Sequence, residues 1–497
     1  MVSFISSTFG VFLSVLCDNL LLTVVVPILP ELLREKEIQN SHELTTYKNH
    51  LTLRNSTDGI PALTNSADES CLKQLFHLHM LNENSQLGIL FSTKAIMQLV
   101  CNPLVGSLTS KIGYKIPLCI GNFILFLCSL VFGFADSYLL FLIGRSFHGL
   151  ASSLVAISGM ALVAELYPYD EDRTRFLGRV MGAAALGVLI GYPFGGFFYA
   201  FVGKTMPFVT IAVLALFNTG LHVSKIHIDW MRNSGGWKSR VNDASVVPTS
   251  SCWRLLRDKS ILIISIAIWL STMAMAVLEP TLPVWLIDNI DPPKWQLGLV
   301  FVPDSLGYFT GTNFFGQVAL RLGRWKTSML SMAAIGTACL VLPMSKMVLQ
   351  LALPHFSLGL GLGIVDASLM PLLAKIADES YHAGYGAVYA LAQTSVALAY
   401  SLGPLIGGQL VPVIGFPDLM ISIGIMNLLF CPFLLFLHET HSETTNNSSL
   451  PIQESGSQQP LLTGDMQMSV MNKFIQPPNS QERISLYQRF YDDIEWE

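Results

Sequence analysis

Five ionisable side chains lie inside stretches that are otherwise apolar enough to cross a bilayer: Asp18, Lys94, Arg145, Glu279 and Asp366. A charge at the centre of a membrane costs about 2.5–3.5 kcal/mol even on the mildest insertion scales, so such residues mark ion or substrate pathways. Two bases and three acids lower that cost when they pair with one another. The pattern predicts a charge network whose acids take up protons and, once ionised, hold a cation. The alternative is that each charge reaches a membrane interface, which suits Lys94 and Glu279 best.

The composition predicts an all-α protein that crosses a membrane many times. Of the 497 residues, 51% are hydrophobic and 13% are charged, and the mean hydropathy is +0.51, whereas soluble domains are about 25% charged. Barrel-strand alternation is absent, which leaves helices. The sequence also has no Ser/His/Asp, metal-ligand or nucleotide-binding spacing, so we expect no enzyme, metal, cofactor or nucleic-acid partner. Segments of the length that a bilayer core requires predict twelve spans, at residues 4–30, 86–106, 116–135, 139–165, 175–199, 205–223, 261–287, 297–318, 327–345, 350–376, 385–411 and 419–437.

Basic residues in the short loops give the orientation. With a cytosolic N-terminus, the cytosolic loops hold sixteen Lys and Arg residues, and the short loops on the other side hold three. Both termini are therefore expected in the cytosol, and the first span is expected to be retained. Residues 31–85 form a polar lumenal loop, expected to be mostly disordered, in which Asn55 starts an N-glycosylation acceptor.

The sequence repeats itself. A motif at residues 106–113 returns at 316–323, 210 residues later, and a second motif at 191–196 returns at 403–408. Transporters built from parallel repeats place the substrate at the midplane between the halves. We predict a six-helix half at 1–223 that contains the lumenal loop, a basic cytosolic linker at 224–260, a second half at 261–437, and a disordered tail at 438–497.

The first repeated motif is Gly-x-x-x-x-[Lys/Arg]-x-Gly, which resembles the cytosolic gate motif of the major facilitator superfamily. It comprises Gly106, Lys111 and Gly113 in one half, and Gly316 and Arg321 in the other. The glycines permit a tight turn, and the base caps helix carbonyls or pairs with an acid. An ordinary basic loop is the alternative.

The second motif, with Gly191 and Pro193 in span five, resembles the antiporter motif of the same superfamily. Small residues four apart let helices approach closely, and the proline bends the span. Packing of small residues alone would also explain it.

The runs around the five charges resemble the vesicular amine transporters, which exchange lumenal protons for cytosolic amines. The resemblance covers about residues 10–437 apart from the lumenal loop, and it is closer to the monoamine branch than to the acetylcholine branch. It rests on Asp18-Asn19-Leu-Leu-Leu-Thr, Phe91-Ser-Thr-Lys94, Gly144-Arg145-Ser-Phe-His-Gly, Leu278-Glu279-Pro-Thr-Leu-Pro-Val-Trp, Lys294-Trp-Gln-Leu-Gly and Gly363-Ile-Val-Asp366-Ala-Ser.

The resemblance implies a role for each residue. Asp18 would hold the substrate ammonium, helped by Asn19 and Glu279. Lys94 would pair with an acid of the opposite half, with Asp366 as the first choice, and would steady the gate. Arg145 would take part in proton coupling, and Asp366 would carry a proton. The cavity would be lined by Gln98, Asn102, Tyr308 and Tyr400.

Three positions depart from the family pattern. The family has an acid in span eleven where this chain has Gln393, which predicts altered proton coupling and a shallower dependence of accumulation on the pH gradient. Thr272 replaces an asparagine of the monoamine branch. Cys71 lacks the cysteine partner of the family's lumenal disulfide and is expected to be unpaired.

These patterns predict a proton-coupled antiporter that loads a cationic monoamine into acidic secretory or synaptic vesicles, without a cofactor and as a monomer. A polyspecific drug/proton or acetylcholine/proton antiporter, and a non-transporting receptor or scaffold, are the alternatives. In the tail, Glu454 with Leu461-Leu462, and Tyr487 with Phe490, resemble sorting signals that clathrin adaptors read.

Overall fold

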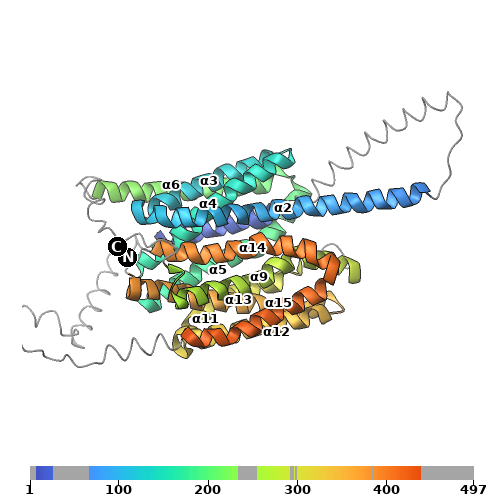
Figure 1. Ribbon diagram of the computed structural model, residues 1–497. Helices are drawn as coiled ribbons and strands as arrows, with labels where there is room; N and C mark the ends of the chain where they lie inside the picture. The colour runs from blue at the N-terminus through green and yellow to red at the C-terminus, as the bar shows by residue number, and fades with distance from the viewer. Residues whose placement is uncertain are drawn as a thin grey trace, which may run out of the picture. The chain divides into compact units, whose positions relative to one another are not determined.

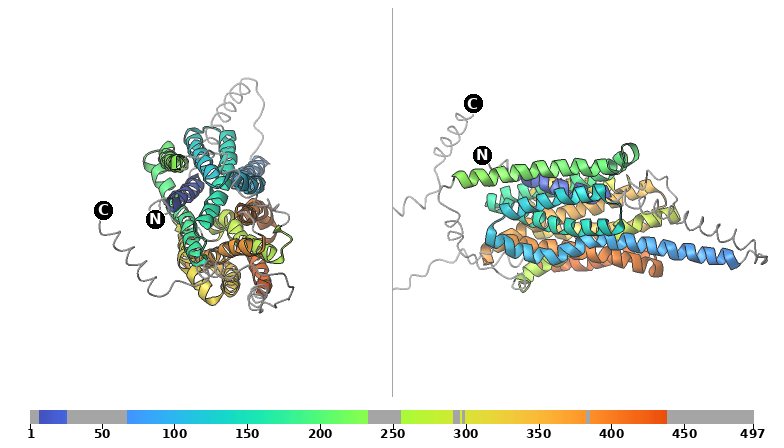
Figure 2. Two further views of the ribbon diagram at one scale, coloured as in Figure 1. Left: turned by 90° about the vertical axis from the view of Figure 1, so that its left-hand side faces the viewer. Right: turned by 90° about the horizontal axis from the view of Figure 1, so that it is seen from above.

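The computed structural model describes residues 7–25, 67–232, 255–290, 296, 299–381 and 385–437. All long elements in these ranges are α-helices that lie side by side as a bundle (Figures 1 and 2). Asn55, Lys294, the tail signals and the side chain of Cys71 lie outside the described residues.

Twelve long helices in the described part of the chain correspond to the twelve predicted spans. They are the first helix (Ser7–Val25), α2 (Ala67–Ile112), α3 (Lys115–Phe134), α4 (Tyr138–Leu166), α5 (Asp170–Phe201), α6 (Thr205–Arg232), α9 (Lys259–Asn289), α11 (Val302–Leu322), α12 (Arg324–Val341), α13 (Val348–Ile376), α14 (Tyr385–Ile414) and α15 (Phe416–Phe430). Eleven contain a segment long and apolar enough to cross a membrane. The exception is α11, whose polar residues include Asp304, Asn313 and Gln317.

Two helices extend furthest beyond their predicted spans, α2 and α6. The helix α2 starts at Ala67 rather than at residue 86, so the segment 67–85, expected to be disordered, is helical. This segment contains neither Pro nor Gly and is rich in Leu, Glu and other helix-forming residues. For the same reason α6 continues to Arg232, nine residues beyond the predicted end at 223. A prediction based on apolar segments misses helical turns that are made of polar residues.

Contacts between the two groups of six helices follow a symmetric pattern. The helix α2, second in the first group, packs on α14, which is fifth in the second group. Reciprocally, α5, fifth in the first group, packs on α11, second in the other.

The most extensive packing between two of the described helices joins α11 and α13, and it depends on glycine. A Cβ atom at Gly311 would lie 2.7 Å from the carbonyl oxygen of Leu360, and one at Gly363 would lie 2.6 Å from that of Tyr308. Glycines let the two backbones meet, as in other membrane helix pairs. The same holds between α2 and α14, where a Cβ atom at Gly106 would lie 3.1 Å from the carbonyl oxygen of Gly386. The gate glycine Gly106 therefore serves a helix crossing.

We expect Gly311→Ala to destabilise the protein by about 1–3 kcal/mol, because the methyl group would press on the backbone of α13. The measurement is the apparent melting temperature in detergent. Gly220→Ala is the matched control, since Gly220 is exposed on α6 and nothing lies within 4 Å of its would-be Cβ. That variant should be neutral or stabilising, because Ala favours helix over Gly. Equal effects of the two changes would contradict the packing account.

Candidate functional site

Asp18 is the centre of a cluster of buried polar groups from three helices. Its Oδ2 lies 3.7 Å from Lys94 Nζ on α2, and its Oδ1 lies 3.0 Å from His148 Nε2 on α4. The hydroxyl of Ser152, one turn further along α4, donates to the same Oδ1. All four side chains are buried. Together with Arg145 they form the central cluster, in which a carboxylate gains the partners that make its burial tolerable.

The expected pairing of Lys94 with Asp366 of the other half is not what the structure shows. Lys94 pairs with Asp18, within its own half, because the face of α2 that carries Lys94 packs directly on α4. A Cβ atom at Gly149 would touch the Lys94 backbone, and Gly149 follows His148 on that helix. From the opposite half, Glu279 interacts electrostatically with Lys94. The acid of the opposite half that acts on Lys94 is therefore Glu279, more weakly than Asp18 does.

Arg145 is fully buried and only partly satisfied. Its Nη2 donates to the carbonyl oxygen of Leu22 at 3.5 Å, and its guanidinium lies 5.6 Å from the ring centre of Phe91 and 6.0 Å from that of Phe132. Its Nε and Nη1 have no hydrogen-bond partner among the described residues. Glu279 interacts with it electrostatically. A guanidinium with unpaired N–H groups close to an acid can donate hydrogen bonds to that acid, to a water molecule or to a substrate oxygen.

Glu279 joins the two halves through Tyr192, a residue that the sequence patterns did not single out. The Tyr192 hydroxyl on α5 donates to Glu279 Oε1 on α9 at 2.7 Å, and the ring stacks on Phe301 with the centres 6.0 Å apart. Tyr192 stands between Gly191 and Pro193, so the motif was interpreted through its small residues alone. A tyrosine beside a proline in an apolar span is the signal that could have revealed it.

Asn19 does not assist Asp18 in this structure. Its amide donates to the carbonyl oxygen of Val15 at 2.9 Å, and its Cβ faces Gly187 on α5. Gly191 of the same helix faces Thr23. The small residues of the predicted antiporter motif thus seat the first helix against α5.

Asp366 and Asp304 form a second acidic region, on α13 and α11. The Tyr308 hydroxyl donates to Asp366 Oδ2 at 2.8 Å, while Asp366 Oδ1 and Asp304 Oδ1 have no partner among the described residues. Tyr400 on α14 interacts electrostatically with both acids and with Glu279. Asp304 was not predicted, because an acid close to the start of a helix is ordinarily attributed to the helix dipole.

Gln98 and Asn102 continue the face of α2 that carries Lys94, four and eight residues further on. Gln98 is half-buried, whereas Asn102 is fully buried and neither polar atom of its amide has a partner in the described part of the chain. Buried amides are normally hydrogen-bonded. The orphaned amide of Asn102 therefore fits the predicted position on a path for water or substrate.

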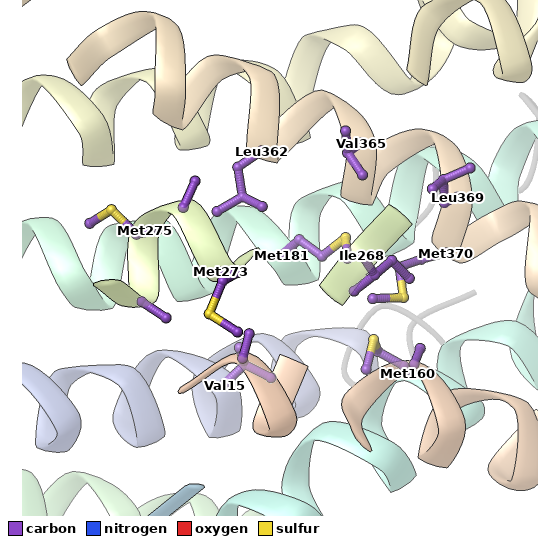
Figure 3. Close-up of a cluster of buried hydrophobic side chains, with 14 of the residues drawn as sticks. Val15, Met160, Met181, Ile268, Met273, Met275, Leu362, Val365, Leu369 and Met370 are labelled. Atoms are coloured by element: carbon purple, nitrogen blue, oxygen red, sulfur yellow. The ribbon is translucent and has the colours of Figure 1, made fainter. Parts of the chain in front are cut away.

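A buried apolar layer rich in methionine lies between helices of both groups. Figure 3 shows its side chains pointing toward one another from the first helix, α4, α5, α9 and α13. Its labelled members are Val15, Met160, Met181, Ile268, Met273, Met275, Leu362, Val365, Leu369 and Met370. Methionine adapts its shape to irregular gaps, so the layer seals the interface without fixing one arrangement of the helices.

Five residues form what we call the gate cluster: Asp170, Arg173, Arg324, Asp378 and Tyr385. Arg173 Nη1 on α5 lies 2.8 Å from Asp378 Oδ2, and Arg324 Nη2 on α12 lies 2.7 Å from Asp170 Oδ1. The Tyr385 hydroxyl donates to Asp378 Oδ1 at 2.7 Å. Both ion pairs join one half to the other, so this end of the bundle is closed.

The bases of the predicted gate motif do not take part. Lys111 and Arg321 are exposed, and neither has an ion-pair partner among the residues that the structure describes. Gly316 faces Thr174 on α5, and Gly113 has a positive φ of 77° in the turn before α3. The motif thus supplies the turn and the helix contact, while Arg173 and Arg324 supply the charges.

Tyr114, in the turn after Gly113, adds a neutral link between the halves. The backbone N–H groups of Tyr385 and Gly386 hydrogen-bond to its side chain. Burial, and to a lesser extent the charge of Glu165, raises the pKa of Tyr114 to about 12. This hydroxyl is therefore protonated across the physiological range.

A charged centre inside a bundle of two six-helix groups that meet at a closed gate is the arrangement of a membrane transporter. The family model of the Major Facilitator Superfamily matches residues 9–389 and 264–463. The chromaffin granule amine transporter of Rattus norvegicus is 37% identical over 462 residues, with 86% of each chain covered. The synaptic vesicular amine transporter of Homo sapiens is 38% identical, covering 86% of this chain and 87% of that one. The chain therefore belongs to the major facilitator superfamily, and within it to the vesicular amine transporter family.

Two further comparisons concern proteins that are less similar to this chain. The vesicular acetylcholine transporter of Torpedo marmorata is 32% identical, covering 86% of this chain and 80% of that one. Among solved structures, the human organic anion transporter MFSD10 superposes with a TM-score of 0.66 at 17% identity, covering 87% of this chain and 99% of that one. The second likeness shows the fold alone.

We expect a double-mutant cycle between Lys94→Gln and Asp18→Asn to show coupling of about 0.5–3 kcal/mol, because each single change strands a buried charge. The measurement is the non-additivity of the changes in apparent melting temperature. The matched cycle between Lys94→Gln and Asp366→Asn should be close to additive. A larger coupling energy between Lys94 and Asp366 than between Lys94 and Asp18 would contradict the pairing seen here and support the pair predicted from the sequence.

We expect Asp378→Asn to speed backbone hydrogen exchange in the first two turns of α5 by about tenfold, since a charged hydrogen bond contributes roughly 1.5–3 kcal/mol. Mass spectrometry of peptides from residues 170–180 gives the rate. The control is Arg175→Gln, which removes an exposed base whose ion-pair partners among the described residues are Glu171 and Asp172 of its own helix. Unchanged exchange in Asp378→Asn would show that the ion pair does not hold this end closed.

Proposed function

We propose that the protein is a proton-coupled antiporter that moves a cationic monoamine from the cytosol into acidic secretory or synaptic vesicles. The observation that carries the proposal is the Asp18 carboxylate, buried at the centre of the bundle and held by a base, an imidazole and a hydroxyl. The names of the amine-transporting relatives agree with a cationic substrate. Relatives named for amines are 37–38% identical, against 32% for the acetylcholine relative, which favours amines over acetylcholine.

In this proposal the ammonium of the substrate competes with Lys94 for Asp18. At 3.7 Å the Lys94 contact is longer than the 2.7–2.9 Å of a charge-assisted hydrogen bond. A substrate ammonium can therefore approach Asp18 Oδ2, while His148 and Ser152 keep their bonds to Oδ1. Asn102 and Gln98 lie on the Lys94 face of α2 and can bind polar groups of the same substrate.

Protons act on the acids of the second half. Protonation of Glu279 from the acidic lumen removes its attraction for Arg145 and Lys94, and Lys94 then turns fully to Asp18. The returning Lys94 displaces the ammonium, which leaves on the lumenal side. Loss of the proton toward the cytosol restores the negative charge on Glu279 and draws Lys94 away again. Asp366, with one free carboxyl oxygen, takes up and releases a proton in the same cycle.

The excess of basic residues predicted for the cytosolic loops supports a cytosolic position for the gate cluster and for both termini. The structure would then represent a state closed to the cytosol by Arg173 and Arg324, with the methionine layer between the two groups of helices. Opening that side requires both ion pairs to separate, and the adaptable methionine side chains lower the cost of parting the layer.

Other parts of the proposal follow from the sequence. The protein acts as a monomer without a cofactor or enzymatic activity, driven by the proton gradient. Asn55 carries a glycan in the lumen, and the tail signals engage clathrin adaptors. A plasma-membrane drug/proton antiporter would share the charges but would have no use for these signals.

We expect Asp18→Asn to lower amine uptake by at least about tenfold while the protein stays folded, because the substrate loses a charge-assisted bond. The measurement is uptake into reconstituted vesicles with an imposed pH gradient, using serotonin, dopamine, octopamine, histamine, tyramine and acetylcholine. Asp172→Asn, which changes an exposed acid of α5, is the control. Uptake close to that of the unmodified protein in Asp18→Asn would exclude the ammonium role.

A further inference from the structure

Asp304 is a buried acid to which the structure gives no structural task. The residue is buried, with an exposed fraction of 6%. Its Oδ1 has no partner, and no N–H or O–H group of the described residues donates to it. An ionised carboxyl group buried without a partner is costly, and binding a proton removes that cost.

The ordinary explanation, an acid that caps the start of a helix, does not apply. Asp258 shows what such a cap looks like in this chain, because its Oδ1 accepts from the backbone N–H groups of Ser260 at 2.8 Å and Ile261 at 3.3 Å. The helix α11 begins at Val302, two residues before Asp304, without any side-chain cap. Asp304 Oδ1 instead points at α13, where it would lie 2.7 Å from a Cβ atom at Gly359.

Asp304 belongs to the acidic region already described. It is one turn before Tyr308, the donor to Asp366, on the same helix. The titratable groups that interact with it electrostatically are Glu279 on α9, Tyr192 on α5, Tyr400 on α14 and Tyr308 on its own helix, and Tyr308 also interacts with Asp366 on α13.

His355 is the base of this region. It is fully buried, and its Nδ1 lies 2.8 Å from the carbonyl oxygen of Val300. A carbonyl oxygen only accepts, so Nδ1 carries the hydrogen and Nε2 is the titrating nitrogen. Nε2 has no partner in the described part of the chain. Gly359, which faces Asp304, is one turn after His355.

The missing acid of α14 belongs to the same region. Gln393 stands where the family pattern has an acid, and Tyr400 follows it two helical turns later, on the same face of α14. Because Tyr400 interacts electrostatically with Asp304, Asp366 and Glu279, this face of α14 is turned toward the acids.

We propose that Asp304 is a proton-carrying acid of the transport cycle and stands in for the acid that is absent at position 393. The proposal rests on the antiport function proposed above. A proton from the lumen forms an O–H bond at the free carboxyl oxygen of Asp304, and water on the cytosolic side later takes that proton away. The absence of an acid at position 393 by itself predicts a shallower dependence of amine accumulation on the pH gradient. With Asp304 as the proton carrier, that shallower dependence is no longer expected.

The test is steady-state accumulation of a labelled amine in reconstituted vesicles over a series of imposed pH differences, with no membrane potential. Each coupled proton changes the accumulation ratio about tenfold per pH unit. Asp304→Asn should therefore lower the ratio by about tenfold per pH unit, and Asp304→Asn with Gln393→Asp should regain it. Asp418→Asn, which changes an exposed acid in the first turn of α15, should leave the slope unchanged.

Four results would overturn the inference. An unchanged slope in Asp304→Asn shows that Asp304 carries no coupled proton. A slope that falls in His355→Gln but not in Asp304→Asn assigns the proton to the histidine. A double variant that keeps the lower slope shows that Asp304 does not replace the span-eleven acid. Loss of amine–amine exchange in Asp304→Asn, measured without a pH gradient, makes Asp304 a substrate ligand.

A different result would exclude the proposed antiport function. If the unmodified protein accumulates none of the amines under any pH gradient, antiport is excluded before any variant is compared. If it accumulates amine and Asp304→Asn behaves identically, only the further inference is lost.

Discussion

The structure depends on the cost of holding charge in a membrane interior. Asp18 is tolerated because Lys94, His148 and Ser152 surround it, and each of these partners is delivered by a helix whose packing the sequence controls. The glycines at helix crossings serve this requirement as much as stability does. Only closely packed helices bring short side chains such as Ser152 and Asp18 into contact.

The central cluster and the acidic region differ in how far their charges are compensated. Around Asp18 the partners are fixed and numerous, which suits a site that must exist before substrate arrives. Around Asp366 and Asp304 the neighbouring polar groups are tyrosines, and each acid has one carboxyl oxygen without a partner among the described residues. Such weakly compensated acids suit a site whose groups bind and release protons. Glu279 and Tyr192 connect the two regions across the halves, so a change of charge in one region alters the electrostatic potential in the other.

The sequence predicted the spans well, and four of the five charges in them, Asp18, Lys94, Arg145 and Asp366, are buried, because both features follow from each residue's own cost of transfer into lipid. Partners were harder to predict. Whether Lys94 meets Asp18 or Asp366 depends on the rotation of α2 about its own axis, which no single segment encodes. Tyr192 and Asp304 were missed because each had an ordinary local explanation. Arg173 and Arg324, which lie in the first turns of α5 and α12, were missed because they were counted only among the basic residues that predict the orientation.

The two ion pairs of the gate cluster are the part of the interface nearest to water. Asp378 and Asp170 are 43% and 38% exposed, whereas Asp18 is 9% exposed by its side chain. Dissolved ions screen exposed charges over about 8 Å at physiological ionic strength and leave buried pairs almost untouched. The salt concentration of the surrounding medium thus acts on the closure of one end of the bundle, while the chemistry at its centre proceeds at the same strength in any medium.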